Sequence, residues 1–201
     1  MASSKVEIWN VSVSHLGSGK VIGSDTEASE EARACSRMWD LCLDKVLRAG
    51  PWSFATRIEA AQLIEEDPND EWLYSYRKPT DCISIKRVLS GARNDDRQSR
   101  VAFKEASDSS GNLFFTDEED AYIEVVYRNT NTQFYTPGFT LAVSYKLASM
   151  IAPKLTKGDP FKMKQDMERM YLMSLAEALA ADGNEDQPDE EPDSEFIRTR
   201  N

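Results

Sequence analysis

Residues 28–55 read ASEEARACSRMWDLCLDKVLRAGPWSFA, and this stretch decides the fold. Gly50 and Pro51 should end a helix here, because glycine tolerates a left-handed C-terminal residue and proline cannot continue the hydrogen-bond ladder. Before them, small and apolar side chains recur at steps of three and four, which places them along one helix face: Ala28, Ala32, Cys35, Trp39, Cys42 and Val46. We therefore predict a core helix closed by an aromatic latch, whose residues are Trp39, Pro51, Trp52 and Phe54.

A short helix and a capping segment are expected before the core helix. Residues 5–16 carry apolar side chains at helical spacing, and Gly-Ser-Gly-Lys at 17–20 ends that segment. Ser-Asp-Thr at 24–26 supplies the expected caps of the core helix, with Ser29 and Glu30 close behind. Hydroxyl and acidic side chains are favoured at helix N-termini, so this order fits a helix start.

The middle of the chain is predicted to be mostly β-structure. Residues 81–89 alternate with period two, and residues 121–127 are rich in β-branched and aromatic side chains, so both segments are typical of strands. Shorter strands are expected at 101–105 and 113–115. Residues 56–67 carry both a helical and an alternating pattern, and we favour an extended conformation for their start.

Two further helices are predicted after residue 136. Apolar side chains at 139–151 form a stripe that ends near Pro153, and a second stripe runs from 160 to 181 and ends at Gly183. The chain is thus expected to be α+β, a helical bundle made from N- and C-terminal helices with an inserted antiparallel β region and an extended C-terminal tail. The expected ranges are 1–50 and 137–182 for the bundle helices, 51–136 for the mostly β insertion, and 183–201 for an acidic docking tail.

The composition excludes several classes of protein. The net charge is −11 and the pI about 4.7, whereas a protein that grips nucleic acid normally presents a basic surface. No signal peptide is evident, and no run reaches the roughly 18 apolar residues of a membrane span. The three cysteines show no metal-ligand spacing and are expected to be reduced. We expect a soluble protein without membrane contact.

The candidate catalytic and metal-binding motifs lack residues or spacings that the corresponding sites require. A phosphate-binding loop needs two glycines that flank four residues and then Lys and Ser or Thr, but at 17–20 the glycines are one residue apart and Val21 follows the lysine. His15 is the only histidine, and no positioned nucleophile accompanies it. The acidic run 117–120 lacks the alternating ligands of a calcium loop. We expect no enzyme activity, no catalytic residue, no cofactor and no metal.

The acidic end of the chain contains one apolar pair. Residues 182–201 hold eight acidic residues and two arginines, and such a segment cannot bury a core of its own. Phe196 and Ile197 interrupt it, with Arg198 and Arg200 close behind. We interpret these four residues as a docking motif that becomes ordered on a partner. The alternative is that they fold back onto their own subunit.

Five blocks of the chain resemble, in the same order, the head-to-tail adaptor (tail tubular protein A-like) family of short-tailed bacteriophages. Each block is a weak match alone, but together they span nearly the whole chain. Two departures are Phe196, where the family usually has tryptophan, and the hydrophilic insertion at 91–100. The blocks are VSHLG at 13–17, LRAGPWSFA at 47–55, WLYSYRKPTDC at 72–82, FYTPGFTLAVSYKLASMIAPKLT at 134–156 and SEFIRTR at 194–200.

The resemblance implies a structural virion protein made in the host cytoplasm. Adaptors of this family form a ring, usually of twelve copies, between the portal protein and the tail nozzle protein. Double-stranded DNA passes through the ring without specific binding, and an acidic lumen would suit that passage. The alternatives are a head-completion or tail component of a longer-tailed phage and, less favoured, an enzyme that uses the loop at 17–20 on a nucleotide.

Overall fold

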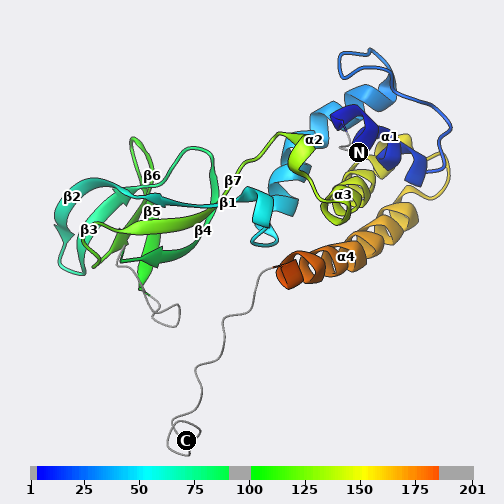
Figure 1. The fold of residues 1–201 in the computed structure, drawn as a ribbon. Coiled ribbons are helices and arrows are strands. Elements are labelled where there is room, and N and C mark those ends of the chain that lie inside the picture. The colour runs from blue at the N-terminus through cyan, green and yellow to red at the C-terminus, as the bar shows by residue number, and fades with distance from the viewer. Residues whose placement is uncertain (1–3, 91–100, 186–201) are drawn as a thin grey trace, which may run out of the picture.

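The computed structural model describes residues 4–90 and 101–185 and shows an elongated molecule with helices at one end and strands at the other (Figure 1). We call the four helices the helical body and the seven strands the β unit. The helices are α1 (Lys5–His15), α2 (Glu30–Arg48), α3 (Pro137–Leu155) and α4 (Pro160–Glu185). The strands are β1 (Thr56–Ala60), β2 (Gln62–Asn69), β3 (Trp72–Arg77), β4 (Cys82–Leu89), β5 (Phe103–Asp108), β6 (Gly111–Thr116) and β7 (Tyr122–Tyr127).

The helical body is built from both ends of the chain, as the sequence predicted. α3 packs against α1, α2 and α4, so that it is the central helix of the body. Its residues Phe139, Val143 and Leu147 are completely buried, because apolar side chains spaced by four occupy the same helix face. The α+β fold class, with the β region inserted between N- and C-terminal helices, is therefore confirmed.

The β unit consists of two antiparallel sheets. One has the strand order β1-β7-β4 and the other the order β2-β3-β6-β5. The ambiguous segment 56–67 is extended, because it supplies β1 and most of β2. Tyr76 and Phe114 stack with ring centroids 5.5 Å apart inside the unit, and Ile123 is completely buried beside them. The predicted loop at 91–100 lies outside the described residues.

The two ends of α2 differ from their expected physical cause. Ser29, not the segment 24–26, caps α2, since its hydroxyl accepts a hydrogen bond from the Ala32 amide. Gly50 does not adopt a left-handed conformation, because positive φ values among the described glycines occur only at Gly17 and Gly111. A Cβ at Gly50 would lie 2.1 Å from Leu179 Cδ2, so the glycine allows α4 to approach the end of α2.

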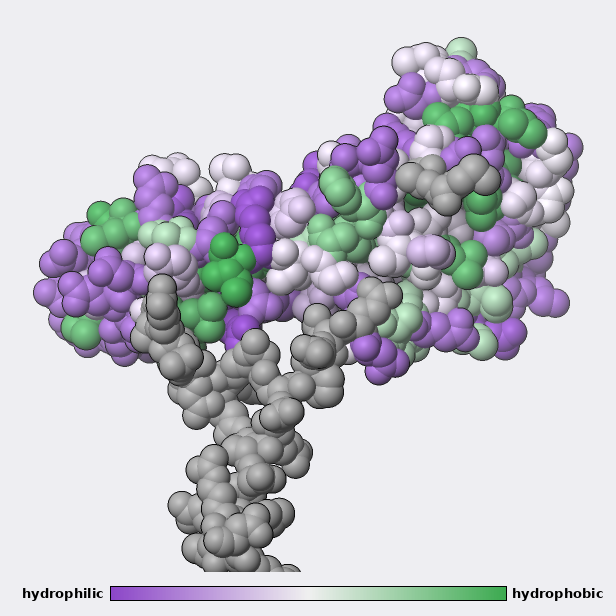
Figure 2. All heavy atoms as spheres, in the orientation of Figure 1, coloured by the Kyte–Doolittle hydropathy of each residue, from purple (hydrophilic) through white to green (hydrophobic). Residues whose placement is uncertain are grey.

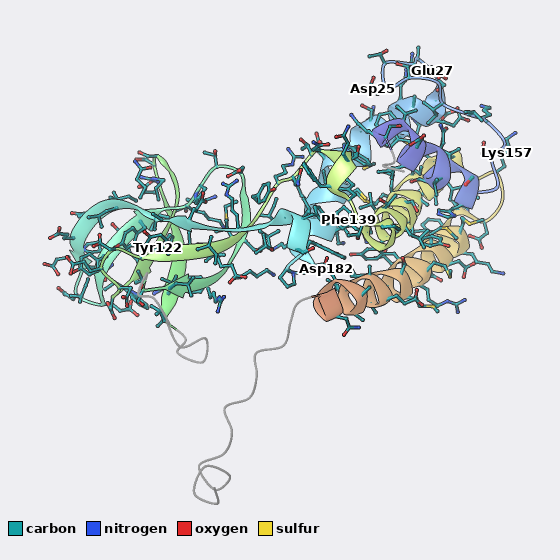
Figure 3. All side chains as sticks on the ribbon, in the orientation of Figure 1. Asp25, Glu27, Tyr122, Phe139, Lys157 and Asp182 are labelled. Carbon is teal, nitrogen blue, oxygen red and sulfur yellow. The ribbon has the colours of Figure 1, made fainter. Side chains whose placement is uncertain are left out.

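α4 is longer than predicted. It continues through Gly183 to Glu185, and so includes the first residues of the expected acidic tail. Asp182 is buried, and its carboxylate accepts hydrogen bonds from the backbone amide and the hydroxyl of Ser53, both at 2.9 Å. Figure 3 shows Asp182 on the last turns of α4, beside the segment that follows α2. This acidic residue is therefore part of the body and joins α4 to the latch segment.

Candidate assembly surfaces

The predicted docking motif lies outside the described residues. Phe196, Ile197, Arg198 and Arg200 follow α4, whose described part ends at Glu185. Their role in binding a portal or a neighbouring subunit therefore stays a prediction from the sequence. The structure does describe the latch, which is buried, and three surface regions. These are the hollow near residues 17–20, the β2–β3 hairpin and the outer face of α4.

Trp52 closes the C-terminal end of α2. Its ring is completely buried, and its indole N–H donates a hydrogen bond of 3.0 Å to the carbonyl oxygen of Val46. The last carbonyls of a helix have no partner within the helix, so the indole satisfies one of them together with the Ala49 amide. This geometry explains why tryptophan follows the Gly-Pro stop. Pro51 itself is exposed.

The latch is larger than the sequence analysis expected, and one predicted member belongs elsewhere. Trp52 and Phe54 each lie 4.8 Å from Phe139 between ring centroids, in edge-to-face contacts. Tyr135 lies 5.3 Å from Phe54 and 4.8 Å from Phe139, and thus completes the cluster. Figure 3 shows Phe139 at this position in the helical body. The periodicity identified Phe139 as a core residue but gave no signal that Tyr135 and Phe139 meet the latch.

Trp39 belongs to a different aromatic pair. Its ring lies 6.2 Å from that of Trp9 in an edge-to-face contact, so that it joins α2 to α1. Trp39 was predicted to belong to the latch, but it stabilises the contact between α1 and α2 instead. Trp39 lies within α2 and Trp52 lies beyond its last residue, Arg48, so the two rings have different neighbours.

The loop at 17–20 borders a hollow of about 730 Å³ with the α3–α4 connection. Its lysine, Lys20, is held in an ion pair of 2.7 Å with Glu31. The N-terminal amides of α4 are occupied as well, because the Asp159 carboxylate accepts from the amides of Phe161 and Lys162 at 3.0 and 3.1 Å. A phosphate needs such amides and a free lysine. Lys20 and two of the first amides of α4 are therefore engaged within the chain, whereas Lys157 and Lys162 also line the hollow.

His15 is placed as a structural residue. Its Nε2 lies 3.0 Å from the Ser144 hydroxyl, which itself donates to the Leu141 carbonyl oxygen at 2.8 Å. A hydroxyl has one proton, so Nε2–H must be the donor to Ser144. A general base would need the opposite direction. Burial also lowers the pKa of His15, and its ring stacks on Tyr145 at 4.1 Å.

The remaining reactive groups are also occupied or buried. Burial raises the pKa of Cys35 and of Cys42 to about 12, so both remain protonated thiols, which are poor nucleophiles. Within residues 4–90 and 101–185, no group of three or more His, Cys, Asp or Glu side chains could hold a metal ion. None of the helices in the same ranges is both long and apolar enough to cross a bilayer.

The β2–β3 hairpin presents an exposed surface with apolar and acidic side chains. Leu63, Ile64 and Leu73 are 46%, 40% and 50% exposed, which is unusual for large apolar residues. Glu65 and Glu66 are exposed on the same hairpin. We call these five residues the β2–β3 surface; they lie on both faces of the sheet, since β2 pairs Glu65 with Ser75 and Glu66 with Tyr74. β2 is an edge strand, because it pairs only with β3 among the described strands.

The outward side of α4 is the second exposed apolar surface. Tyr171, Ser174 and Ala178 are buried against the body, so the residues on the opposite side of the helix face outward. Leu172 and Met173 are 57% and 55% exposed there. We define the α4 face as Lys162, Arg169, Leu172, Met173, Ala176 and Ala180, all of which are exposed. Of the four methionines of α4, Met173 is exposed on this side, whereas Met163, Met167 and Met170 are half-buried.

The two units are joined by packing and by an ion-pair cluster. Arg128, which follows β7, lies 2.6 Å from Asp44 and 3.0 Å from Asp40 on α2. Val126 of β7 belongs to the buried cluster of the helical body. These contacts set the β unit at a defined position beside the body.

Comparisons with protein-family models and with curated proteins find no match to this chain.

Proposed function

We propose that this chain is a non-catalytic structural subunit of a head-to-tail adaptor ring in a short-tailed phage virion. In this proposal, the ring lies between the portal protein and the tail nozzle protein, and double-stranded DNA passes through it. The five sequence blocks that resemble the adaptor family support the proposal. So does the fold, because the helices at both chain ends form one body and the segment between them projects as a separate unit.

The observation that carries the proposal is the presence of two different exposed apolar surfaces on an elongated subunit. The β2–β3 surface lies on two strands and the α4 face on a helix, and the two differ in residue type. Subunits of a closed ring contact one another head to tail, so each must offer two unlike patches. Figure 2 shows hydrophobic patches on both the β unit and the helical body, set among hydrophilic residues. A self-contained monomer has no need for apolar surfaces at both ends.

The acidic tail supplies a further contact in this proposal. The tail follows α4, and Phe196 and Ile197 are the apolar residues of its docking motif. An apolar pair within an acidic segment suits a groove on a partner, because that partner can bury it where the tail itself cannot. The net charge of −11 limits adhesion to the DNA that passes.

The test uses purified portal rings from the same phage. The full chain, a chain that ends at residue 193 and the double variant Phe196→Ala with Ile197→Ala are each mixed with portal rings and imaged by electron microscopy. We expect the full chain to add a ring to the portal, and both altered chains to attach at least about tenfold less well while their circular dichroism stays unchanged. Thr199→Ala is the matched control and should attach normally.

Two outcomes would contradict the proposal. A full chain that does not attach to portal rings would refute the adaptor role itself. Truncated chains that attach as well as the full chain would leave the adaptor role and refute docking by the tail.

A further inference from the structure

The hollow beside residues 17–20 has an apolar floor. Leu16 and Leu155 pack against the buried cluster of the helical body and also line the hollow, together with the half-buried Met163. They come from the end of α1, the end of α3 and the start of α4. Binding pockets in proteins are of the same size as this hollow of about 730 Å³, so it can accept two large apolar side chains of a peptide.

Two lysines at the hollow are unpaired. Lys157 and Lys162 are exposed and line the hollow, and neither forms an ion pair with any residue in the ranges 4–90 and 101–185. The third lysine there, Lys20, is already paired with Glu31 at 2.7 Å. The hollow therefore offers two positive charges to a bound segment.

One carboxylate at the hollow is also available. Asp166 is half-buried, lines the hollow and forms no ion pair with a described residue. Asp159 lines it as well, but its carboxylate accepts from the first amides of α4. The hollow thus combines two free lysines, one free carboxylate and an apolar floor, which suits a peptide of mixed charge with an apolar centre.

The docking motif of the tail has such a composition. Two acidic residues precede the apolar pair Phe196 and Ile197, and two arginines follow it. These four charged residues are Asp193, Glu195, Arg198 and Arg200. The two acidic residues complement the two free lysines, the apolar pair complements the floor, and an arginine complements Asp166.

The motif reaches the hollow of its own molecule only if the linker is almost fully stretched. Figure 3 shows Lys157 and Asp182 at opposite ends of α4. From Met163 to Glu185 the helix axis advances about 33 Å, at 1.5 Å per residue. Phe196 follows Glu185 by 11 residues, which span at most about 36–40 Å when fully extended. Stretching the linker along its own helix costs conformational entropy, which favours the hollow of another copy.

We propose that the docking motif of one subunit binds the hollow of the next copy of this chain. Phe196 and Ile197 would cover the apolar floor, and the charged residues around them would fix the register. The motif and the hollow are unlike and belong to opposite ends of α4, so the contact is heterologous and its repetition can close a ring. The inference rests on the proposed ring-forming role and names the partner of the docking motif.

This contact also accounts for the expected role of the tail in portal binding. A closed ring attaches to the portal through many equivalent contacts at once, whereas a single subunit attaches through one. Loss of the contact between subunits should therefore weaken attachment to portal rings.

A phosphate is a poorer occupant of the hollow. It would use Lys157 and Lys162, but it would gain nothing from the apolar floor. The carboxylates of Asp159 and Asp166 would also repel it. The docking motif uses both the charged and the apolar parts of the hollow.

Two full-chain variants test the contact. The tail variant carries Phe196→Ala and Ile197→Ala, and the hollow variant carries Lys157→Glu and Lys162→Glu. Sedimentation velocity follows self-association of each purified chain up to millimolar concentration. We expect the unaltered chain to form assemblies larger than dimers, and each variant alone to associate at least about tenfold more weakly.

An equimolar mixture of the two variants tests the direction of the contact. The hollow variant keeps an intact motif, and the tail variant keeps an intact hollow. One intact contact can therefore form between them, and the resulting pair has no intact site left. We expect the mixture to form dimers and nothing larger.

Cross-linking identifies the molecule that the motif contacts. Phe196→p-benzoylphenylalanine is introduced into a chain labelled with ¹⁵N, which is then mixed with unlabelled chain, irradiated and analysed by mass spectrometry. We expect cross-links from the labelled tail to the unlabelled segment 155–163, because the floor of the hollow includes both ends of this segment.

A control variant separates local from global charge effects. Lys154→Glu with Lys164→Glu changes the net charge as much as the hollow variant does, at exposed lysines of α3 and α4 that do not line the hollow. It should associate like the unaltered chain. Circular dichroism should be the same for the control and the hollow variant, because all four altered lysines are exposed.

Four results would overturn the contact. An unaltered chain that stays monomeric at every concentration is the first, and a mixture that forms no dimers is the second. The third is a set of cross-links from position 196 that stay within one molecule. The fourth is a hollow variant that loses binding of ATP in calorimetry but still self-associates, which would assign the hollow to a nucleotide.

Attachment to portal rings is measured separately. Cross-links from position 196 to the portal, with self-association unchanged in the tail variant, would leave the adaptor role in place and refute only the contact between copies. A chain that self-associates as expected but never attaches to portal rings would instead refute the adaptor role and leave the contact in place.

Discussion

The helical body and the β unit differ in how much apolar surface each one buries. The buried cluster of the body draws on all four helices and includes the large side chains Trp9, Trp52 and Phe139. The cluster of the β unit is smaller and centres on Tyr76 and Phe114. Buried apolar area is the main favourable term in folding, so the body should contribute most of the stability of the chain.

The β unit carries several partly exposed ion pairs, one of which includes the buried Lys78. Arg57 pairs with Asp81 at 2.9 Å, Arg77 with Asp108 at 2.9 Å, and Lys78 with Glu105 at 2.7 Å. Exposed ion pairs contribute only about 0–1 kcal/mol each, whereas a buried aromatic ring contributes several times more. We therefore expect a substitution in the buried cluster of the helical body to lower the free energy of unfolding more than the loss of an ion pair in the β unit.

Trp52→Ala should have the largest effect. It removes a completely buried ring from the latch and leaves the Val46 carbonyl oxygen without its indole partner. We expect a loss of about 3–5 kcal/mol in the free energy of unfolding, measured by urea denaturation followed by circular dichroism. Trp52→Phe keeps most of the ring and should cost less. Phe134→Ala, at a ring that is 60% exposed, is the control and should be close to neutral. A near-neutral Trp52→Ala would refute the latch.

Gly138→Ala tests the close packing of α3 on α4. A Cβ at Gly138 would lie 2.9 Å from Ala178 Cβ and 3.2 Å from Ala178 Cα, so the two helices would have to separate. We expect a loss of about 1–3 kcal/mol in the free energy of unfolding. Gly158→Ala is the matched control, because a Cβ there meets no atom within 4 Å.

A double-mutant cycle makes the Gly138 prediction more specific. Ala178→Gly removes the atom nearest to the new Cβ, so the pair Gly138→Ala with Ala178→Gly should cost less than the sum of the two single variants. Purely additive losses would show that the two positions are not in contact.

The sequence predicted the fold class because the elements of both units have clear periods. The helical stripes at 28–46 and 139–151 and the alternation at 81–89 are local signals, and each element formed where its pattern placed it. The prediction that residues 56–67 begin in an extended conformation was also confirmed, because β1 starts at Thr56. Helix ends were less predictable. Gly50 is needed because the Leu179 side chain, which is distant in sequence, packs against it, and Gly183 does not end α4.

The candidate surfaces were harder to predict from the sequence, because the exposure of a side chain depends on the whole fold. Leu63 and Ile64 are apolar like buried strand residues, and only the sheet order shows that they lie on an edge strand. In the same way, Trp39 and Trp52 belong to one sequence stretch, but their neighbours Trp9 and Phe139 come from different helices. The tail motif, Phe196 with Ile197, remains a prediction from sequence.

Asp108→Asn should have the smallest effect and tests the charge-based stability of the β unit. Both oxygens of the Asp108 carboxylate accept hydrogen bonds of 2.9 Å from Arg77, and these bonds lower its pKa from 3.8 to about 2. A carboxyl group with a depressed pKa stabilises the folded state above its unfolded pKa, and that contribution disappears as the pH falls through the folded value. The unaltered chain should therefore melt slightly higher than Asp108→Asn at neutral pH.

This difference between the two chains should shrink as the pH falls from about 4 to about 2, because the Asp108 carboxylate then becomes protonated and resembles the neutral amide. Thermal melts at a series of pH values measure it directly. Asp70→Asn, at an exposed aspartate of the same unit that has no ion pair with a described residue, should show no comparable pH dependence. A difference that stays constant down to pH 2 would mean that packing of the side chain, rather than its charge, stabilises the hairpin. In that case the two units of this molecule would be stabilised in the same way, and the contrast between them would be one of size alone.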